Sequence, residues 1–297
     1  MSPFHEGERA VQARAGVRAA ARDLGRGIFR VIPAGAIPFL EHQRLAALAG
    51  TDDRGRVWAS VASGPPGFIT APDPHTLRLA APLAPADPLR EGLAAGRAVG
   101  VLVLDLERRR RIRLNGRSSG RAEVIEVTIE EVFGNCPKYI QARTHDDRPA
   151  MARPGTARRA PALSTAQGLA IARADTFFIA SRHAAGADAS HRGGRPGFVK
   201  VDDAGHLRFP DYAGNNMFQT LGNLTSDPRV GLVFVDWDTG ATWQLTGRAH
   251  IRWDAAARAD LPGAERAVEV EIDEVVEIDG RGPIGWRLLE YSPVNPR

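Results

Sequence analysis

The sequence contains a single cysteine, Cys136, and this scarcity bears on where the protein works. One thiol cannot form an internal disulfide, which favours a reducing, cytoplasmic location. Long apolar runs are also absent, since none approaches the roughly 20 residues that a membrane-spanning helix needs. The N-terminal stretch has no apolar core of the signal-peptide kind. We therefore expect a cytoplasmic protein that makes no contact with membranes.

Lysine is nearly as rare and occurs only at positions 138 and 200. The isoelectric point of about 9.8 would suit nucleic acid, but the net charge is only +4 and acidic residues are interspersed throughout. We therefore expect no nucleic-acid partner. The histidines and the cysteine show no ligand-like spacing, so no metal site is expected either.

The sequence does contain an internal repeat. Four stretches of the first half return in the second: SGPPGFITA (63–71) as GGRPGFVKV (193–201), VGVLVLDL (99–106) as VGLVFVDW (230–237), IRLNGRS (112–118) as WQLTGRA (243–249), and VTIEEVF (127–133) as VEIDEVV (270–276). Their offsets lie between 130 and 143 residues. A period this long indicates duplicated domains, and the chain is long enough for two.

Each copy has the pattern of a β-rich domain. Residues 242–253 and 267–275 alternate apolar and polar side chains, which is typical of strands with one buried face. Short strands between Gly, Pro and Asp turns favour a small antiparallel barrel in each copy. Helices are expected before each barrel, after Ser164 and from Pro38 through FLEHQRLAAL, and one amphipathic helix over EGERAVQARAGVRAAARDL near the N-terminus.

These patterns predict four parts along the chain. An N-terminal helical segment covers 1–35, the first copy 36–143, a linker rich in Arg, Pro and Ala 144–162, and the second copy 163–297.

One long stretch, RPGFVKVDDAGHLRFPDYAGNNMFQTLGNLTSDPRVGLVFVDW (195–237), resembles the core of a known family. It is similar to the pyridoxamine 5′-phosphate oxidase-like, FMN-binding split β-barrel family. FHEGE (4–8) and NCPKYI (135–140) resemble the bacterial members of that family with two tandem copies. The resemblance implies an α+β, β-rich fold of two tandem split β-barrels with flanking helices, arranged as a pseudo-dimer.

The resemblance implies that the second copy binds the FMN phosphate. A phosphate dianion needs charge-assisted donors, which Arg195 and Lys200 supply if a bulge at Pro196–Gly197 turns both side chains to one ligand. Asn215 and Asn216 stand where the family has an Arg-Lys pair, at the start of an expected helix. The other residues expected near the cofactor in this copy are Ser190, Arg192, Phe198, Val199 and Asp211.

The first copy differs from the second at the phosphate positions, where it has Pro65, Thr70 and Ala81. It has instead a basic strand that resembles the one by which the family contacts the flavin of the partner subunit. The residues expected to reach the flavin from the first copy are Arg111, Arg113, Asn115 and Lys138. The prediction is one composite flavin site per chain, with the second site degenerate.

The expected function is an FMN-binding oxidoreductase with an unassigned small-molecule substrate. His191 is the candidate for a hydrogen bond to the flavin or for an acid role, because His titrates near neutral pH. Two alternatives stay open: an F420-dependent reductase, and a non-catalytic flavin- or haem-binding carrier or electron-transfer protein. A ferredoxin-reductase-like electron donor and a homodimer also stay open as partners.

Overall fold

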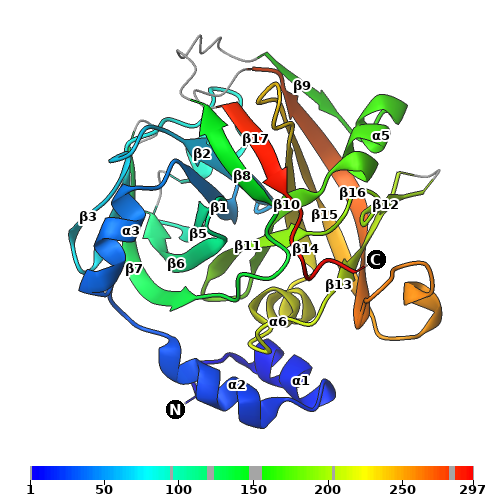
Figure 1. Cartoon of the computed structure of the whole chain (residues 1–297), viewed down its shortest axis with the longest axis horizontal. Coiled ribbons are helices and arrows are strands. Elements are labelled where there is room, and N and C mark those ends of the chain that lie inside the picture. Colours follow the sequence, from blue (N-terminus) through cyan, green and yellow to red (C-terminus); the bar gives the residue numbers. More distant parts are fainter. Residues whose placement is uncertain are drawn as a thin grey trace.

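The computed structural model describes residues 2–93, 96–118, 124–146, 156–202, 205–280 and 285–296 (Figure 1). The fold is β-rich with a few helices, as expected. Its helices are α1 (Glu6–Arg14), α2 (Arg18–Leu24), α3 (Ile37–Glu41), α4 (Leu89–Gly92), α5 (Thr165–Arg173) and α6 (Gln219–Ser226). No helix among these residues is long and apolar enough to cross a membrane.

Two antiparallel sheets dominate the molecule. The first has the strand order β2 (Val57–Ser63), β1 (Leu45–Thr51), β5 (Ala98–Asp105), β6 (Arg110–Ser118), β7 (Ile125–Gly134), β4 (Thr76–Leu79) and β3 (Ile69–Asp73). The second has the order β11 (Ala187–Gly193), β10 (Thr176–Arg182), β14 (Arg229–Val235), β15 (Thr242–Arg252), β16 (Arg266–Ile278), β13 (Leu207–Asp211) and β12 (Lys200–Val201). The sequence repeat is thus matched by a repeat of strand order.

Two further pairings lie outside this common order. β9 (Ala157–Ala160) pairs with β16, and β17 (Gly285–Glu290) pairs with β8 (Ala142–Asp146). β8 follows the first sheet in the chain and β17 follows the second, so this small sheet ties the two copies together (Figure 1). β9 lies inside the segment predicted to be a linker, 144–162. Residues 147–155 of that segment are outside the described residues.

The repeated glycines have structural reasons. Gly116 and Gly247 each sit at a register shift with the neighbouring strand, and a Cβ at either would lie 1.9 Å from a backbone oxygen. Gly67 and Gly197 have φ of 89° and 91°, in the left-handed half of backbone space that favours glycine. Pro-Gly-Phe therefore forms a turn in both copies, not part of a strand with a bulge.

The two copies pack on each other through β2, β5, β11 and β14. A shared core cluster joins side chains of both copies, including Leu45, Leu102, Phe178 and Val233. Gly100 on β5 faces the backbone of Asp188 and Ala189 on β11, where an added Cβ would be 2.6 Å away. Gly231 on β14 faces Trp58 in the same way, at 2.5 Å. These close approaches explain why both copies have Val-Gly at this place.

Two helix predictions are confirmed only in part. The helix expected from Pro38 is α3, which ends at Glu41. LAAL at 45–48 is the start of β1, because residues 45–50 are buried between layers and burial overrides the helix propensity of Ala and Leu. The N-terminal segment forms two helices, α1 and α2, separated near Gly16 with φ of 73°. Helix α5 is confirmed, with Ser164 as its N-cap and a capping box to Gln167.

Strand β15 is confirmed, and its polar side is solvated only in its second half, where Arg248, His250 and Arg252 are exposed. In the first half, Gln244 is 1% exposed and donates to the Ala59 carbonyl oxygen at 3.0 Å and to the Ser60 hydroxyl at 2.7 Å. In that half, the alternation seen in the sequence therefore separates the core of one copy from the interface with the other.

Candidate functional site

One pocket is built from both copies. Its lining residues from the first copy are Arg111, Arg113, Asn135, Cys136, Lys138 and Tyr139. Those from the second are Ser190, His191, Arg192, Gly193, Phe198, Pro210, Asp211, Tyr212, Gly214, Asn215, Asn216, Phe218, Gln219, Thr220 and Leu221. Strands β6 and β11 form one side, and the loop before α6 forms another.

The structure brings together ten of the predicted residues in this pocket. They are Arg111, Arg113, Lys138, Ser190, His191, Arg192, Phe198, Asp211, Asn215 and Asn216. Arg195, Val199, Lys200 and Asn115 do not line it. The pocket is therefore lined by residues of both copies, as predicted. Arg195 and Lys200, which were expected to bind the phosphate, are not among them.

Arg195 and Lys200 are exposed and do not converge. The Phe198 amide donates to the Arg195 carbonyl oxygen at 3.0 Å, which closes a turn in place of the expected bulge. The Arg195 guanidinium lies over the Tyr291 ring at 5.5 Å. Lys200 is on β12 opposite Arg208. Val199 is buried in the core of the second copy.

A buried ion pair joins the two copies at the back of the pocket. Arg113 donates through Nη1 to Asp188 Oδ2 at 2.9 Å and through Nη2 to Ser190 Oγ at 2.5 Å. Asn115 donates to Asp188 Oδ1 at 3.3 Å from the far side of this pair, which is why it lines a neighbouring cavity instead. The pair fixes β6 of one copy against β11 of the other.

Arg111 is a partly buried cation, with its Nε atom buried, for which the described residues provide no ion pair. Its Nη2 donates to the Cys136 carbonyl oxygen at 2.6 Å, and its Nη1 lies 3.2 Å from His191 Nδ1. Burial, with the nearby positive charges of Arg113 and Arg192, lowers the pKa of Arg111 to about 9. An anion placed here would offset both effects.

His191 is held in one tautomer. Because a guanidinium only donates hydrogen bonds, Nδ1 accepts from Arg111 and the proton resides on Nε2. Burial and then the surrounding arginines, Arg111 foremost, hold the pKa of His191 well below its ordinary value. His191 is therefore a neutral hydrogen-bond donor at neutral pH, which does not suit the acid role considered from the sequence.

Asp211 organises the cations of the second copy. It accepts from Arg192 Nη1 at 2.7 Å and from Arg266 Nε at 2.8 Å. Asp211 therefore positions Arg192 in the pocket wall. Its negative charge is balanced by the two arginines, Arg192 and Arg266.

Four buried donors in the pocket wall have no hydrogen-bond partner among the described residues. They are Nε of Arg111, Arg113 and Arg192 and Nε2 of His191. Such groups are normally satisfied in native proteins, so their clustering points to an acceptor-rich, negatively charged ligand. No group of three or more His, Cys, Asp or Glu in the described ranges could hold a metal ion.

Two tyrosines at this pocket were not identified from the sequence. Tyr139 and Tyr212 come from different copies and have ring centroids 4.8 Å apart. The Tyr139 hydroxyl donates to the Ala213 carbonyl oxygen at 3.1 Å. Tyr139 lies in NCPKYI and Tyr212 follows β13 directly. Only the structure shows that these two segments lie next to each other.

The equivalent positions at the other end of the interface are mostly apolar, and the cavity beside them is lined by both acidic and basic residues, including Arg56, Asp87 and Glu274. Ala81 and Leu83 replace the polar loop of the second copy and are buried with Leu89, Val276 and Ile278 in one core cluster. Gln244 occupies the position of Arg113 and donates to Asp87 Oδ2 at 3.1 Å. The basic cluster therefore has no counterpart here.

One family model matches part of the chain. Residues 165–283 match the model of the family described as pyridoxamine 5′-phosphate oxidase. No curated protein matches the chain at a significant level.

Solved structures match about two fifths of the chain. A putative pyridoxamine 5′-phosphate oxidase from Lactobacillus delbrueckii is 20% identical over 39% of this chain and 94% of its own, with a TM-score of 0.32. HupZ of Group A Streptococcus is 14% identical over 37% and 90%, with a TM-score of 0.30. The FAD binding protein from Mycobacterium smegmatis is 14% identical over 40% and 98%, with a TM-score of 0.29. Through residues 165–283, the chain is similar to the family described as pyridoxamine 5′-phosphate oxidase.

Proposed function

We propose that this chain is an FMN-dependent oxidoreductase with one composite flavin site, built from two tandem split β-barrels arranged as a pseudo-dimer. The observation that carries the proposal is the set of four unpaired buried donors, three of them guanidinium groups, contributed by both copies to one pocket. The match of residues 165–283 to the pyridoxamine 5′-phosphate oxidase family model supports a flavin as the ligand.

The residues of the pocket fit the two negative parts of FMN. Lys138, Asn215 and Asn216 line the part of the pocket next to the loop before α6 and would hold the phosphate. Arg111 and the neutral Nε2–H of His191 would face the N1–O2 edge of the ring, where negative charge develops on reduction. The flavin supplies hydride or electron transfer, and the protein supplies orientation and this electrostatic stabilisation.

One site per chain follows from the asymmetry of the two ends. The counterpart has the apolar residues Pro82, Pro85 and Ala86 where the pocket has Tyr212, Asn215 and Asn216. The proposed boundaries are those expected from the sequence, with the first barrel at 36–143 and the second at 163–297. A cytoplasmic location, a small-molecule substrate and a ferredoxin-reductase-like electron donor complete the proposal and rest on the sequence alone, and a homodimer remains open.

An F420-dependent reductase is the second candidate, because the same arginines would suit the anionic tail of that deazaflavin. Haem is disfavoured by one contact. A histidine ligand must present an unprotonated nitrogen, whereas the Arg111 donor facing His191 Nδ1 keeps the proton on Nε2.

Titration of the cofactor-free protein with FMN, followed by flavin fluorescence, tests the proposal. Arg111→Gln removes the buried charge while keeping a donor, and we expect FMN binding to weaken about tenfold or more. The matched control is Lys200→Gln, an exposed residue outside the pocket, which should leave affinity and the stoichiometry of one FMN per chain unchanged. Equal losses in both variants, or two equivalent flavins per chain, would contradict the site proposed here.

A further inference from the structure

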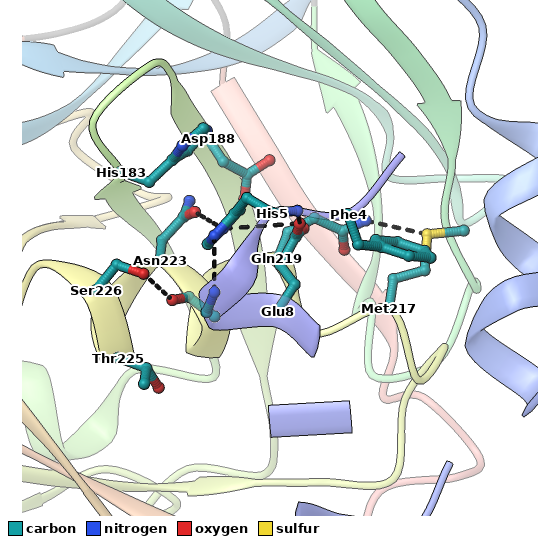
Figure 2. A network of polar contacts seen from close by, with 12 residues as sticks. Phe4, His5, Glu8, His183, Asp188, Met217, Gln219, Asn223, Thr225 and Ser226 are labelled. Carbon is teal, nitrogen blue, oxygen red and sulfur yellow. Dashed lines mark hydrogen bonds and ion pairs between the residues drawn. The ribbon is translucent and has the colours of Figure 1, made fainter. Parts of the chain in front are cut away.

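The N-terminal FHEGE motif is used to dock the N-terminal segment onto α6. Phe4 is buried with Met217 and Phe133, and His5 Nε2 lies 2.9 Å from Asn223 Oδ1 on α6. A Cβ added at Gly7 would be 2.2 Å from the Gly222 carbonyl oxygen, so only glycine allows this approach of α1 to α6. Figure 2 shows Phe4, His5 and Glu8 gathered against Met217, Gln219 and Asn223. No residue of the motif lines the proposed flavin pocket.

The same segment reaches the loop that forms the phosphate end of that pocket. The Gln12 side chain, 3% exposed, donates from Nε2 to the Met217 carbonyl oxygen at 2.9 Å. Met217 packs against Phe4, so both its backbone and its side chain are held by the N-terminal segment.

The loop held in this way is conformationally costly. Asn216 and Phe218, on either side of Met217, have φ of 61° and 62°. A left-handed conformation costs a residue with a side chain roughly 1–2 kcal/mol, and phenylalanine has no side-chain hydrogen bond with which to offset it. Near the loop, the Asn215 side chain accepts from the Met217 amide at 3.1 Å, and Gln219 Nε2 donates to Met217 Sδ at 3.0 Å. The Arg266 guanidinium lies 4.9 Å from the centre of the Phe218 ring. Such a conformation persists when its surroundings impose it.

We propose that Gln12 is a positioning residue for the phosphate end of the flavin site, and that docking of the N-terminal segment and phosphate binding reinforce each other. This inference rests on the proposed function. A loop that is already ordered costs less to use in binding, so a docked segment raises the affinity for a ligand with a phosphate. By linkage, a bound phosphate must stabilise the docked segment to the same extent.

The test replaces Gln12 with a side chain of similar size that cannot donate. In Gln12→Met, the backbone amides of Met217–Gln219 should exchange hydrogen for deuterium about tenfold faster than in the wild type, since they lose the support of one buried hydrogen bond. Arg9→Met places the same new side chain at an exposed position of α1 and should leave this exchange unchanged. Unchanged exchange in Gln12→Met would overturn the inference whether or not the protein binds flavin.

The affinity test separates positioning from general damage. In Gln12→Met, FMN should bind about fivefold to tenfold more weakly, while riboflavin, which lacks the phosphate, should bind as to the wild type. Equal losses for both ligands, or no loss for FMN, would overturn the inference. If the wild type binds neither flavin, the proposed function fails, and the exchange experiment still decides whether Gln12 holds the loop.

Discussion

At the scale of single residues, the site depends on a charge balance around Arg113. The carboxyl groups of Glu8, Glu131 and Asp188 influence one another, and those of Glu8 and Asp188 also interact with the buried guanidinium of Arg113. Glu8 is 6% exposed and lies on α1, beside Asp188 in the cavity behind the pocket (Figure 2). Burial, and then repulsion by Glu131 and Asp188, raise the pKa of Glu8 to about 8, against the hydrogen bond that its carboxylate accepts from the His5 amide. Glu8 is therefore mostly protonated at neutral pH.

The raised pKa of Glu8 predicts a pH-dependent stability. The ordinary value is 4.5 and the folded value about 8, so between them the folded state holds a proton that the unfolded state has lost. The contribution of Glu8 to the free energy of unfolding is then complete below about pH 4.5 and is lost as the pH rises through 8. Glu8→Gln keeps the acceptor but cannot ionise, so its stability relative to the wild type should improve by about 1–3 kcal/mol between pH 5 and pH 8.5.

Urea unfolding at several pH values measures this difference. Glu6→Gln, on the exposed side of the same helix, is the matched control and should show no such trend. A constant offset between Glu8→Gln and the wild type across this range would show that Glu8 does not titrate as expected.

At the scale of elements, the site depends on how closely the strands of the two copies approach. Gly100 brings β5 against the backbone of Asp188, the partner of Arg113, and Gly231 brings β14 against Trp58 at the other end of the interface. The two contacts are equivalent in geometry but only the first supports the pocket. This makes them a natural pair for separating stability from binding.

Gly100→Ala and Gly231→Ala should each destabilise the protein by about 1–3 kcal/mol, because backbone atoms cannot move aside for the new methyl group. Only Gly100→Ala should also weaken FMN binding, since it displaces Asp188 and with it Arg113. Thermal unfolding and FMN titration of both variants measure the two effects. A loss of affinity in Gly231→Ala equal to that in Gly100→Ala would refute a local role for the β5–β11 contact.

These elements also show what the sequence can and cannot predict. Alternation located β15, and the capping residues located α5, because both signals are local. Residues 45–48 (LAAL) were predicted as helix but form the start of β1. Their burial between layers depends on residues far away in the chain, which local sequence patterns do not show. Arg195 and Lys200 were predicted to reach one phosphate from a bulged strand. The positive φ of Gly197 makes a turn instead, so their spacing along a strand does not apply. The family resemblance predicted that Arg111 and His191 lie near each other although they belong to different copies, and both line one pocket in the structure.

At the scale of the whole molecule, the two copies are joined more tightly than the chain connection between them requires. They share a core cluster, the Arg113–Asp188 pair, a contact of Arg56 with Glu274, and the sheet of β8 with β17. Apolar burial across such an interface is the main contribution to association, and the buried pair adds geometric specificity. The pocket proposed to bind flavin is lined by residues of both copies.

This arrangement predicts that the connection between the copies is dispensable once the protein has folded. A protease site inserted between residues 149 and 152, outside the described residues, would allow the purified protein to be cut there. We expect the fragments to stay together in size-exclusion chromatography, to unfold in a single transition, and to bind one FMN per pair with unchanged affinity. Gly100→Ala in the cut protein should promote separation, because it weakens the same interface. Fragments that separate at once, or a single fragment that binds FMN alone, would show that the site does not need both copies.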